Sequence, residues 1–300
     1  MQPLTESYEY CRELTQRTAH NFRYSFMTLP AEKRRAMEVL YAFNRITDDL
    51  GDENNVPLEL KQARLASWHE SLRLALGHDS DRKHALAPKT GEVGTFWDHP
   101  ALSAIADMAE RFKIPVEYLF AVIDGVESDL KPVAITTFVE LEQYCFRVAG
   151  AVGLCCIHVW GFKDERAKPL AIDCGLAFQL TNILRDIAED AELGRVYIPA
   201  EDLARFQYSR EELEQGVNND RFAALMKFEV ERAKGYYANA EQLFDFLEPQ
   251  GRRILRVMVD IYGGLLKEIE RRQFDVFSQR VSLPKWKKLW YAVRASLSRS

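Results

Sequence analysis

The sequence has few of the residues that mark several large protein classes. It holds five cysteines among 300 residues, and no two of them form a C-x-x-C pair. This odd number favours a reduced, cytoplasmic setting with buried free thiols. No apolar run is long enough to span a bilayer, and the first residues, MQPLTESYEY, lack the basic and apolar regions of a signal peptide. Any membrane contact is therefore expected to be peripheral.

Positive charge is not in excess either. The 40 lysines and arginines face 45 aspartates and glutamates, which gives a net charge of -5 at pH 7. Binding to a nucleic-acid backbone relies on dense lysine and arginine, so no nucleic-acid partner is expected. A nicotinamide fingerprint is also missing, because Gly150-Ala-Val-Gly153 lacks the strand–turn–helix context of a dinucleotide site.

What the sequence does have is helical periodicity almost throughout, which predicts an all-α fold. Hydrophobic residues make up 47% of the chain, and no low-complexity stretch or charge block divides it, so we expect one domain over residues 1–300. Thr137 and Glu140 have the spacing of a capping box, which predicts the start of a helix. Pro115 marks the start of the preceding helix, at 116–130. Short β-branched runs such as 133–137 are too few to build a sheet, and 77–100 is expected to be a loop. We expect helices at 31–50, 58–76, 101–112, 116–130, 137–160, 165–189, 221–247 and 252–274.

The first polar motif lies at the end of the helix predicted from residue 31. Asp48 and Asp52 are four residues apart and share one helix face, with Arg45 and Tyr41 on the preceding turns. Carboxylates stacked in this way repel each other by about 0.2–0.5 kcal/mol, and the negative end of the helix dipole adds to the repulsion. A bound cation would reverse this effect, and such oxygen ligands suit Mg²⁺.

The second motif is a continuous polar stripe on the helix predicted at 165–189. Gln179, Asn182, Asp186 and Asp190 follow one another at steps of three, four and four residues. The positions between them are mostly leucine and isoleucine, which predicts a largely buried helix whose polar stripe must be satisfied by something. Arg195 follows shortly after and supplies a cation.

A single motif of this kind is more often part of the solvated surface than a metal-binding site. Two such motifs on apolar helices favour a shared binding site. Facing each other across a cavity, they would hold Mg²⁺ ions and, with Arg45, Arg185 and Arg195, bind a diphosphate. Departure of that diphosphate leaves an allylic carbocation, which a dry pocket protects and aromatic faces stabilise. Ordinary core packing is the alternative for each candidate lining residue, least so for Tyr41 and Tyr144. The candidates are Phe22, Phe26, Tyr41, Tyr144, Phe146, Val148, Val152, Phe178, Leu184 and Tyr262.

These motifs resemble those of the squalene/phytoene synthase family. The first reads Tyr41-Ala-Phe-Asn-Arg-Ile-Thr-Asp-Asp-Leu-Gly-Asp-Glu. The second reads Gln179-Leu-Thr-Asn-Ile-Leu-Arg-Asp-Ile-Ala-Glu-Asp, followed by Gly194-Arg-Val-Tyr-Ile-Pro. A third match is Tyr144-Cys-Phe-Arg-Val-Ala-Gly-Ala-Val-Gly, and Arg280-Val-Ser-Leu-Pro-Lys-Trp-Lys-Lys-Leu-Trp looks like bacterial members. The similarity extends from about residue 10 to residue 295.

The resemblance implies an isoprenoid synthase fold, a helical bundle around a central cavity between two aspartate-rich helices. The implied reaction is a Mg²⁺-dependent head-to-head condensation of two isoprenoid diphosphates. One substrate ionises and attacks the double bond of the other, giving a cyclopropyl diphosphate, and a second ionisation rearranges this intermediate or releases a product. The implied metal ligands are Asp48, Asp52, Asp186 and Asp190. The implied substrate contacts are Arg45, Gln179, Asn182, Arg185 and Arg195, with Tyr41, Tyr144 and Tyr262 in the cavity.

The resemblance leaves the substrate open. Many members carry a Ser-Lys/Gly-Ser-Phe element near the N-terminus, where this chain has Ala19-His20-Asn21-Phe22. This form looks closer to bacterial hopanoid-pathway enzymes, which favours farnesyl diphosphate as the source of presqualene diphosphate or a squalene-type triterpene, or conversion to hydroxysqualene. A 15-cis-phytoene synthase acting on geranylgeranyl diphosphate is the alternative. Since no nicotinamide fingerprint is present, a downstream reductase or desaturase is the expected pathway partner.

Two further alternatives share the same fold. One is a terpene cyclase or a chain-elongating prenyl synthase, which would give a different product. The other is a non-catalytic assembly factor, of the kind whose relatives have lost their acidic motifs. Both motifs are intact in this chain, which weighs against that reading.

The C-terminal tail, residues 284–300, is basic and amphipathic. From Lys285 to Arg299 it has five basic residues and no acidic one, together with Trp286, Trp290 and Tyr291. This composition suits a lipid interface, and it would place the protein at the inner face of the cell membrane. The alternative is a final amphipathic helix packed on the core, and this interpretation is slightly favoured.

Overall fold

A computed structural model describes residues 2–19, 23–26, 29–53, 56–77, 96, 98–131 and 134–297. Within these ranges the regular structure is helical, and β-pairing is limited to two isolated bridges, Ala134 with Val196 and Phe162 with Leu247. The predicted all-α fold is therefore confirmed. The chain divides into two compact units, Met1–Lys131 and Pro132–Ser300. A single domain over residues 1–300 stays a prediction.

Prolines set the start of several helices in the first unit. Pro30, Pro57 and Pro115 each occupy the position before a helix, where their fixed φ is already suitable and no backbone donor is lost. The helices predicted at 31–50, 58–76, 101–112 and 116–130 are confirmed within two residues. Residues 20–22 and most of the expected loop at 77–100 lie outside the described ranges. The helices are α1 (Leu4–Thr18), α2 (Arg23–Phe26), α3 (Ala31–Asp52), α4 (Leu58–Leu76), α6 (Leu102–Arg111) and α7 (Val116–Ser128).

Trp68 of α4 is the largest fully buried side chain in the first unit. Its ring stacks on Phe43 with the ring centroids 6.3 Å apart, and its Nε1 donates a hydrogen bond to Thr47 Oγ1 at 3.0 Å. Thr47 in turn donates to the Phe43 carbonyl at 2.9 Å. These contacts bury one face of α3 and leave Asp48 on the solvent-accessible face.

In the second unit the four predicted helices are confirmed within three residues of their expected ends. The predicted capping box is also present, since Thr137 Oγ1 accepts from the Glu140 amide and Glu140 Oε2 accepts from the Thr137 amide, both at 3.3 Å. The helices are α8 (Phe138–Cys145), η1 (Phe146–Gly150), α9 (Ala151–Trp160), α10 (Ala167–Glu192), α11 (Ala200–Arg205), α12 (Arg210–Glu214), α13 (Asp220–Phe246), α14 (Pro249–Arg271) and α15 (Lys285–Leu297).

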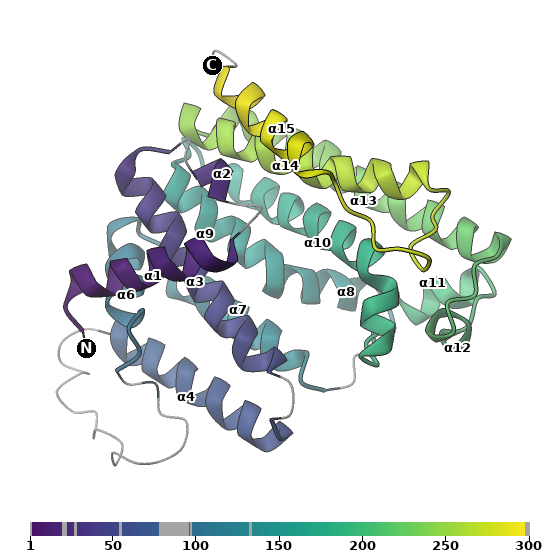
Figure 1. Cartoon of the computed structure of the whole chain (residues 1–300), viewed down its shortest axis with the longest axis horizontal. Coiled ribbons are helices and arrows are strands. Elements are labelled where there is room, and N and C mark those ends of the chain that lie inside the picture. The colour runs from purple at the N-terminus through teal and green to yellow at the C-terminus, as the bar shows by residue number, and fades with distance from the viewer. Residues whose placement is uncertain are drawn as a thin grey trace. The chain divides into compact units, whose positions relative to one another are not determined.

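Helix α10 is the central element of the second unit and packs against α13, α14, α9 and η1 (Figure 1). Small residues allow this close approach, because a Cβ on Gly175 would lie 2.6 Å from the Ala149 carbonyl oxygen and one on Gly153 would lie 2.7 Å from the Ala171 oxygen. The stretch predicted as one α-helix at 137–160 contains a π-helical turn, η1, at this contact. Such turns often occur at functional sites, and the hydrophobic periodicity of a sequence does not predict them.

A buried charge cluster fixes α11 on α13. The Arg232 guanidinium donates to Asp202 at 2.7 Å and to Glu229 at 2.8 Å, and it lies 3.9 Å from the ring centroid of Phe138. Both carboxylates are almost fully buried, so this arginine is needed to keep them from being unpaired charges. The cluster orders the chain that follows the second acidic motif.

The five cysteines are all free and buried. Burial raises the pKa of Cys11 and of Cys156 to about 12, and it also raises the pKa of the other three thiols. The sequence interpretation as buried free thiols is therefore confirmed.

Helix α15 lies along α14 (Figure 1). Ala295 on its inner face is buried, and Arg294 forms an ion pair with Asp260 of α14. Packing on the core, the favoured interpretation of the tail, is confirmed for this face. None of the helices within the described ranges is both long enough and apolar enough to cross a bilayer.

Candidate active site

The first acidic motif lies along one face of α3. Asp48 keeps contact with solvent, yet the protein atoms around it and the charge of Asp52 raise its pKa to about 7. Asp49 and Asp129 act in the same direction, while Arg45 opposes them. Burial and the neighbouring aspartates therefore disfavour the negative charge of Asp48, and a bound cation would offset this effect.

Arg45 is paired with a neighbour in its own helix. Its guanidinium contacts Asp49 at 2.6 Å, and both side chains are about half exposed. Asp129, at the end of α7, did not emerge from the sequence as part of the motif. It is placed there by the close approach of α7 to α3, where a Cβ on Gly51 would lie 2.6 Å from Val126 Cγ1. An interhelix contact of this kind has no signal in local spacing.

The second acidic motif lies on α10, whose apolar positions are buried as predicted. The Asn182 amide donates to Gln179 Oε1 at 3.3 Å, which links two members of the polar stripe. Arg185 Nε donates to Asp186 Oδ1 at 2.8 Å, and both side chains are less than a fifth exposed. Asp186 is therefore already partnered by a cation from its own helix.

A second arginine reaches Asp186 from far along the chain. Arg280, in the segment between α14 and α15, donates from Nε to Asp186 Oδ1 at 3.0 Å and contacts Glu189 at 3.3 Å. In the sequence, Arg280 belongs to a segment that resembles bacterial members of the family, and no site role is predicted for it. A separation of 94 residues explains this, because only the fold brings the two side chains together.

Arg195 returns to the end of α10 through a Schellman turn. Gly194 adopts a φ of +72°, which favours glycine. The Gly194 amide donates to the Ala191 carbonyl at 2.9 Å, and the Arg195 amide donates to the Asp190 carbonyl at 2.8 Å. The turn thus keeps the backbone of Arg195 beside that of Asp190, as their spacing in sequence suggested.

The aromatic candidates of the second unit form two stacked pairs. Tyr144 stacks on Tyr197 with ring centroids 4.9 Å apart, and Phe178 stacks on Tyr262 at 4.5 Å. Burial raises the pKa of Tyr262, an effect that Arg185 and a hydrogen bond with Asn182 partly offset. Tyr262 therefore joins the polar stripe to an aromatic surface, whereas Tyr144 belongs to a separate stack.

The remaining candidate lining residues have mixed positions. Leu184 and Phe26 are buried in the cores of their units, which fits ordinary packing. Phe146, Val148 and Val152 are partly buried in or beside η1. Phe22 lies outside the described residues. Tyr41 is partly buried on α3.

The structure thus brings the predicted residues together in two sets. In the first unit, Arg45, Asp48 and Asp52 follow Tyr41 on α3. The second set, on α10 and the segments packed against it, contains Gln179, Asn182, Arg185, Asp186, Asp190, Arg195 and Tyr262, and Arg280 joins it. That the two sets form one site stays a prediction.

The donor atoms of both sets fit a divalent cation of the magnesium type. Each motif offers two carboxylates four residues apart, and Mg²⁺ is usually held by one or two carboxylates plus substrate phosphate oxygens and water. The raised pKa of Asp48 marks a carboxylate that a cation would stabilise. Within the described ranges, no three histidine, cysteine, aspartate or glutamate side chains converge in a ready-made metal-binding group.

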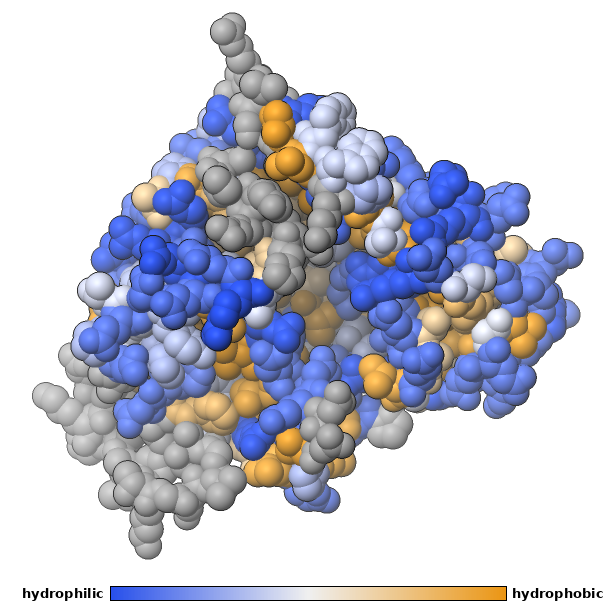
Figure 2. Space-filling model, viewed as in Figure 1, coloured by the Kyte–Doolittle hydropathy of each residue, from blue (hydrophilic) through white to orange (hydrophobic). Residues whose placement is uncertain are grey.

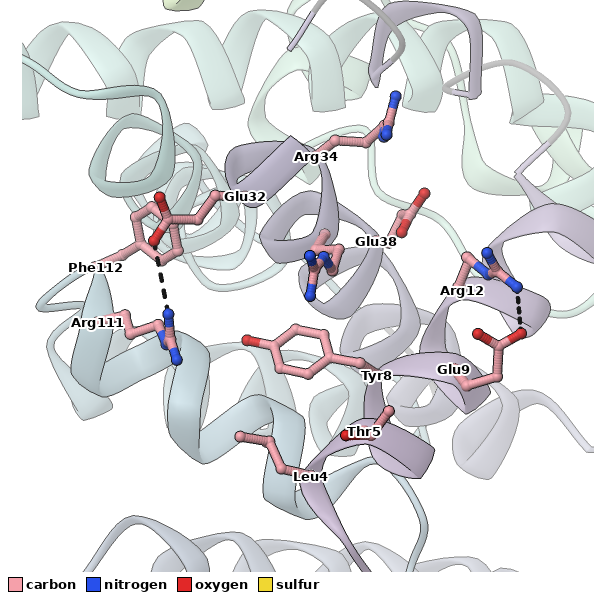
Figure 3. Close-up of a pocket in the computed structure, with 11 residues that line it drawn as sticks. Leu4, Thr5, Tyr8, Glu9, Arg12, Glu32, Arg34, Glu38, Arg111 and Phe112 are labelled. Atoms are coloured by element: carbon pink, nitrogen blue, oxygen red, sulfur yellow. Dashed lines mark hydrogen bonds and ion pairs between the residues drawn. The ribbon is translucent and has the colours of Figure 1, made fainter. Parts of the chain in front are cut away.

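A separate cavity of about 730 Å³ lies in the first unit between α1, α3 and α6 (Figure 3). Tyr8 lines it and donates to Asp107 at 2.6 Å, and Arg12, Arg34 and Glu38 line it as well. None of the predicted site residues lines this cavity. Four arginines and three glutamates line it, so their charges nearly cancel and give a diphosphate little net attraction.

Known proteins identify the family. The squalene/phytoene synthase family model matches residues 15–287. The chain is 35% identical over 302 residues to a phytoene synthase of Arthrospira platensis, covering 95% of this chain and 91% of that protein. It is also 35% identical over 301 residues to a 15-cis-phytoene synthase of Synechocystis, covering 95% and 83% of the two chains.

Solved structures agree on the fold. A squalene synthase from Alicyclobacillus acidocaldarius matches with a TM-score of 0.78 at 26% identity and covers 90% of this chain and 95% of that one. A dehydrosqualene synthase matches with a TM-score of 0.78 at 24% identity, over 97% and 96% of the two chains. The predicted isoprenoid synthase fold is thereby confirmed. The chain belongs to the squalene/phytoene synthase family, prenyltransferase-type enzymes that use a divalent metal to join isoprenoid diphosphates head to head.

Proposed function

We propose that this protein catalyses the Mg²⁺-dependent head-to-head condensation of two isoprenoid diphosphates. The observation that carries the proposal is the placement of both aspartate motifs. Each lies with an arginine on the polar face of a helix whose other faces are buried, in a chain that matches the family over nearly its full length. The proposal requires the two motifs to act on the same substrates.

The arginines of the second set have a clear part in diphosphate binding. Arg185 and Arg280 both donate hydrogen bonds to Asp186. Guanidinium groups bind phosphate as readily as carboxylate, so an arriving diphosphate can take over their donors and release the Asp186 carboxylate. Arg45 and Arg195 supply further positive charge. The aspartates that would hold Mg²⁺ are Asp48, Asp52, Asp186 and Asp190.

Bound Mg²⁺ would neutralise the charge that grows on the departing diphosphate. The protein then has to protect the resulting cation. The stacked rings of Phe178 and Tyr262 offer an aromatic surface beside the polar stripe. Burial raises the pKa of Tyr262, so its hydroxyl stays neutral and does not become a phenolate that would capture the cation.

Two substrates fit this proposal. The Ala19-His20-Asn21-Phe22 element and the structural match to a squalene synthase favour farnesyl diphosphate, with presqualene diphosphate, a squalene-type triterpene or hydroxysqualene as the product. The 35% identity to phytoene synthases favours geranylgeranyl diphosphate and 15-cis-phytoene. A downstream reductase or desaturase would complete either pathway.

We also place the protein in the cytoplasm, in peripheral contact with the inner face of the cell membrane. Five free, buried cysteines suit a reducing compartment. The products of this chemistry are insoluble in water, so a protein in contact with a membrane could release them directly into the bilayer.

Product analysis tests the proposal directly. The purified protein is incubated with farnesyl, geranylgeranyl or presqualene diphosphate, with Mg²⁺ and without NADPH, and the products are identified. A head-to-head product that requires Mg²⁺ is expected, whereas a longer linear allylic diphosphate would identify a chain-elongating enzyme. The double variant Asp48→Asn/Asp186→Asn should release diphosphate at least roughly 100-fold more slowly than the unchanged chain. If that variant still supports function in the cell, the assembly-factor alternative becomes the better account.

A further inference from the structure

The outer face of α15 carries a row of large apolar side chains that are largely exposed. Trp286, Leu289, Trp290 and Val293 are 69%, 49%, 50% and 47% exposed. Their spacing of three, one and three residues places them on one side of the helix over two turns. We call these four residues the α15 stripe. In Figure 2, orange and nearly white side chains interrupt the blue surface in the upper part of the view, where Figure 1 places α15.

The opposite face of α15 is firmly held. Ala295 is buried against α14, and Arg294, at the edge between the two faces, forms an ion pair with Asp260. At Gly264 of α14 a Cβ would lie 3.1 Å from Leu283 Cδ1 and 3.2 Å from the Tyr291 hydroxyl, so the glycine lets the tail lie close. The stripe is therefore presented outwards by a fixed helix.

The segment that carries the stripe has charged residues of one sign only. After Asp275 the sequence contains no acidic residue but six basic ones: Arg280, Lys285, Lys287, Lys288, Arg294 and Arg299. The guanidinium of Arg294 lies 4.9 Å from the ring centroid of Trp290, which ties one cation to the stripe itself. The whole chain has a net charge of -5, so this basic segment stands out from the rest of the molecule.

We propose that the α15 stripe is the surface through which the protein docks on an anionic lipid bilayer. Tryptophan prefers the boundary between acyl chains and head groups, and leucine and valine add apolar area to be buried there. The flanking lysines and arginines are attracted to anionic head groups. A second copy of this chain would bring the same basic residues beside its own stripe, so charge complementarity favours the anionic lipid surface.

Vesicle binding tests this proposal without substrate, so its result is independent of the catalytic proposal. The full chain is floated with vesicles of phosphatidylcholine and phosphatidylglycerol, and with vesicles of phosphatidylcholine alone. The chain should bind the anionic vesicles, and Trp286→Ser/Trp290→Ser should weaken that binding at least roughly tenfold. The matched control is Val139→Ser, which removes an apolar side chain that is 60% exposed on α8 and should bind as the unchanged chain does.

A charge variant and a depth measurement complete the test. Lys287→Gln/Lys288→Gln should weaken binding to anionic vesicles by roughly tenfold and leave binding to neutral vesicles unchanged. Brominated lipids should quench tryptophan fluorescence of the unchanged chain, which reports insertion without any substitution. No binding of the unchanged chain, equal binding by the tryptophan variant, or absence of quenching would each overturn the proposal. So would a dimer that the tryptophan variant dissociates while vesicles stay unbound, because the stripe would then join two copies.

Discussion

Asp186 is held by two arginines that reach it from different parts of the chain. Arg185 is its immediate neighbour on α10, whereas Arg280 comes from the segment that follows α14. Only Arg280 is largely exposed, with 53% of its side chain accessible to solvent. It can therefore move to a diphosphate with little loss of packing, while Arg185 is constrained by burial.

Replacing Arg280 by glutamine should weaken substrate binding more than it slows turnover. The variant keeps a hydrogen-bonding side chain but loses the charge, so we expect kcat/KM to fall by about 10–100-fold, mostly through KM. Steady-state kinetics with varied isoprenoid diphosphate measures this. Arg166→Gln is the control, since Arg166 is also exposed and paired, with Asp164 at 2.9 Å. An unchanged KM in Arg280→Gln would show that this arginine does not bind diphosphate.

A histidine in the first unit makes stability depend on pH. His99 packs edge-on against Trp68 with ring centroids 5.1 Å apart, and its Nδ1 accepts a hydrogen bond from the Ala101 amide at 3.3 Å. Burial lowers the pKa of His99 to about 4, so the folded protein keeps it neutral. The unfolded chain takes up a proton near pH 6.5. The stabilisation is therefore complete above pH 6.5 and is lost as the pH falls from 6.5 towards 4.

The variant His99→Phe should flatten this part of the stability profile. Phenylalanine retains the ring packing but cannot take up a proton, so the acid-induced loss should shrink by on the order of 2–3 kcal/mol between pH 6.5 and pH 4. Thermal unfolding of both proteins across this range measures the difference. Parallel profiles would mean that His99 is not the group responsible. The variant starts from lower stability at pH 7, because the Ala101 amide loses its acceptor.

At the scale of helices, the contact between α10 and η1 depends on glycine. A Cβ at Gly175 would clash with the Ala149 carbonyl group and with Gly150, all of them backbone atoms that cannot move aside alone. We therefore expect Gly175→Ala to lower the free energy of unfolding by about 1–3 kcal/mol. Gly235 of α13 is the matched control, since a Cβ there meets nothing within 4 Å.

Gly235→Ala should stabilise the protein by about 0.5–1 kcal/mol, because alanine loses less backbone entropy in a helix. Differential scanning calorimetry of both variants checks the pair of predictions. If both substitutions lowered the melting temperature equally, close backbone packing at Gly175 would not be the cause.

Local sequence patterns predicted most of the long helices, but they missed α1 and the short or irregular helices. The capping box at Thr137 was found because a long apolar stretch followed it. The same pattern at Ser209, whose hydroxyl accepts from the Glu212 amide at 3.1 Å, precedes only the five residues of α12. The π-helical turn was missed as well, because it coincides with the approach of α10 rather than with a change in periodicity.

At the scale of the whole chain, each compact unit carries one acidic motif. If both motifs act on one reaction, removing either should remove most of the activity that depends on the metal. We therefore expect Asp48→Asn and Asp186→Asn each to lower kcat/KM by roughly 100-fold or more, and the double variant to lose much less than the product of the two effects.

Single-turnover diphosphate release by the three variants measures this coupling. Asp124→Asn, which changes an exposed aspartate of α7 in the first unit, should remain within a few-fold of the unchanged chain. Fully multiplicative losses in the double variant would show that the two motifs act independently, and the shared-site prediction would then be wrong.

The motif residues could be predicted because their members share one helix and helical spacing alone aligns them. Contacts between residues far apart in the sequence could not be predicted, since no helical spacing relates Arg280 to Asp186 or Asp129 to Asp48. The aromatic pairs show the same limit. Tyr144 and Tyr262 both appeared as cavity candidates, yet Tyr262 stacks on Phe178 beside the polar stripe and Tyr144 stacks on Tyr197.

The deep burial of all five native thiols has a practical consequence for labelling. With their pKa values raised and their sulfur atoms enclosed, these cysteines should resist alkylating reagents at neutral pH while the chain is folded. A cysteine introduced at an exposed position such as Leu193 or Val139 would then react alone. The protein thus accepts single spin labels or fluorophores without prior removal of its own cysteines.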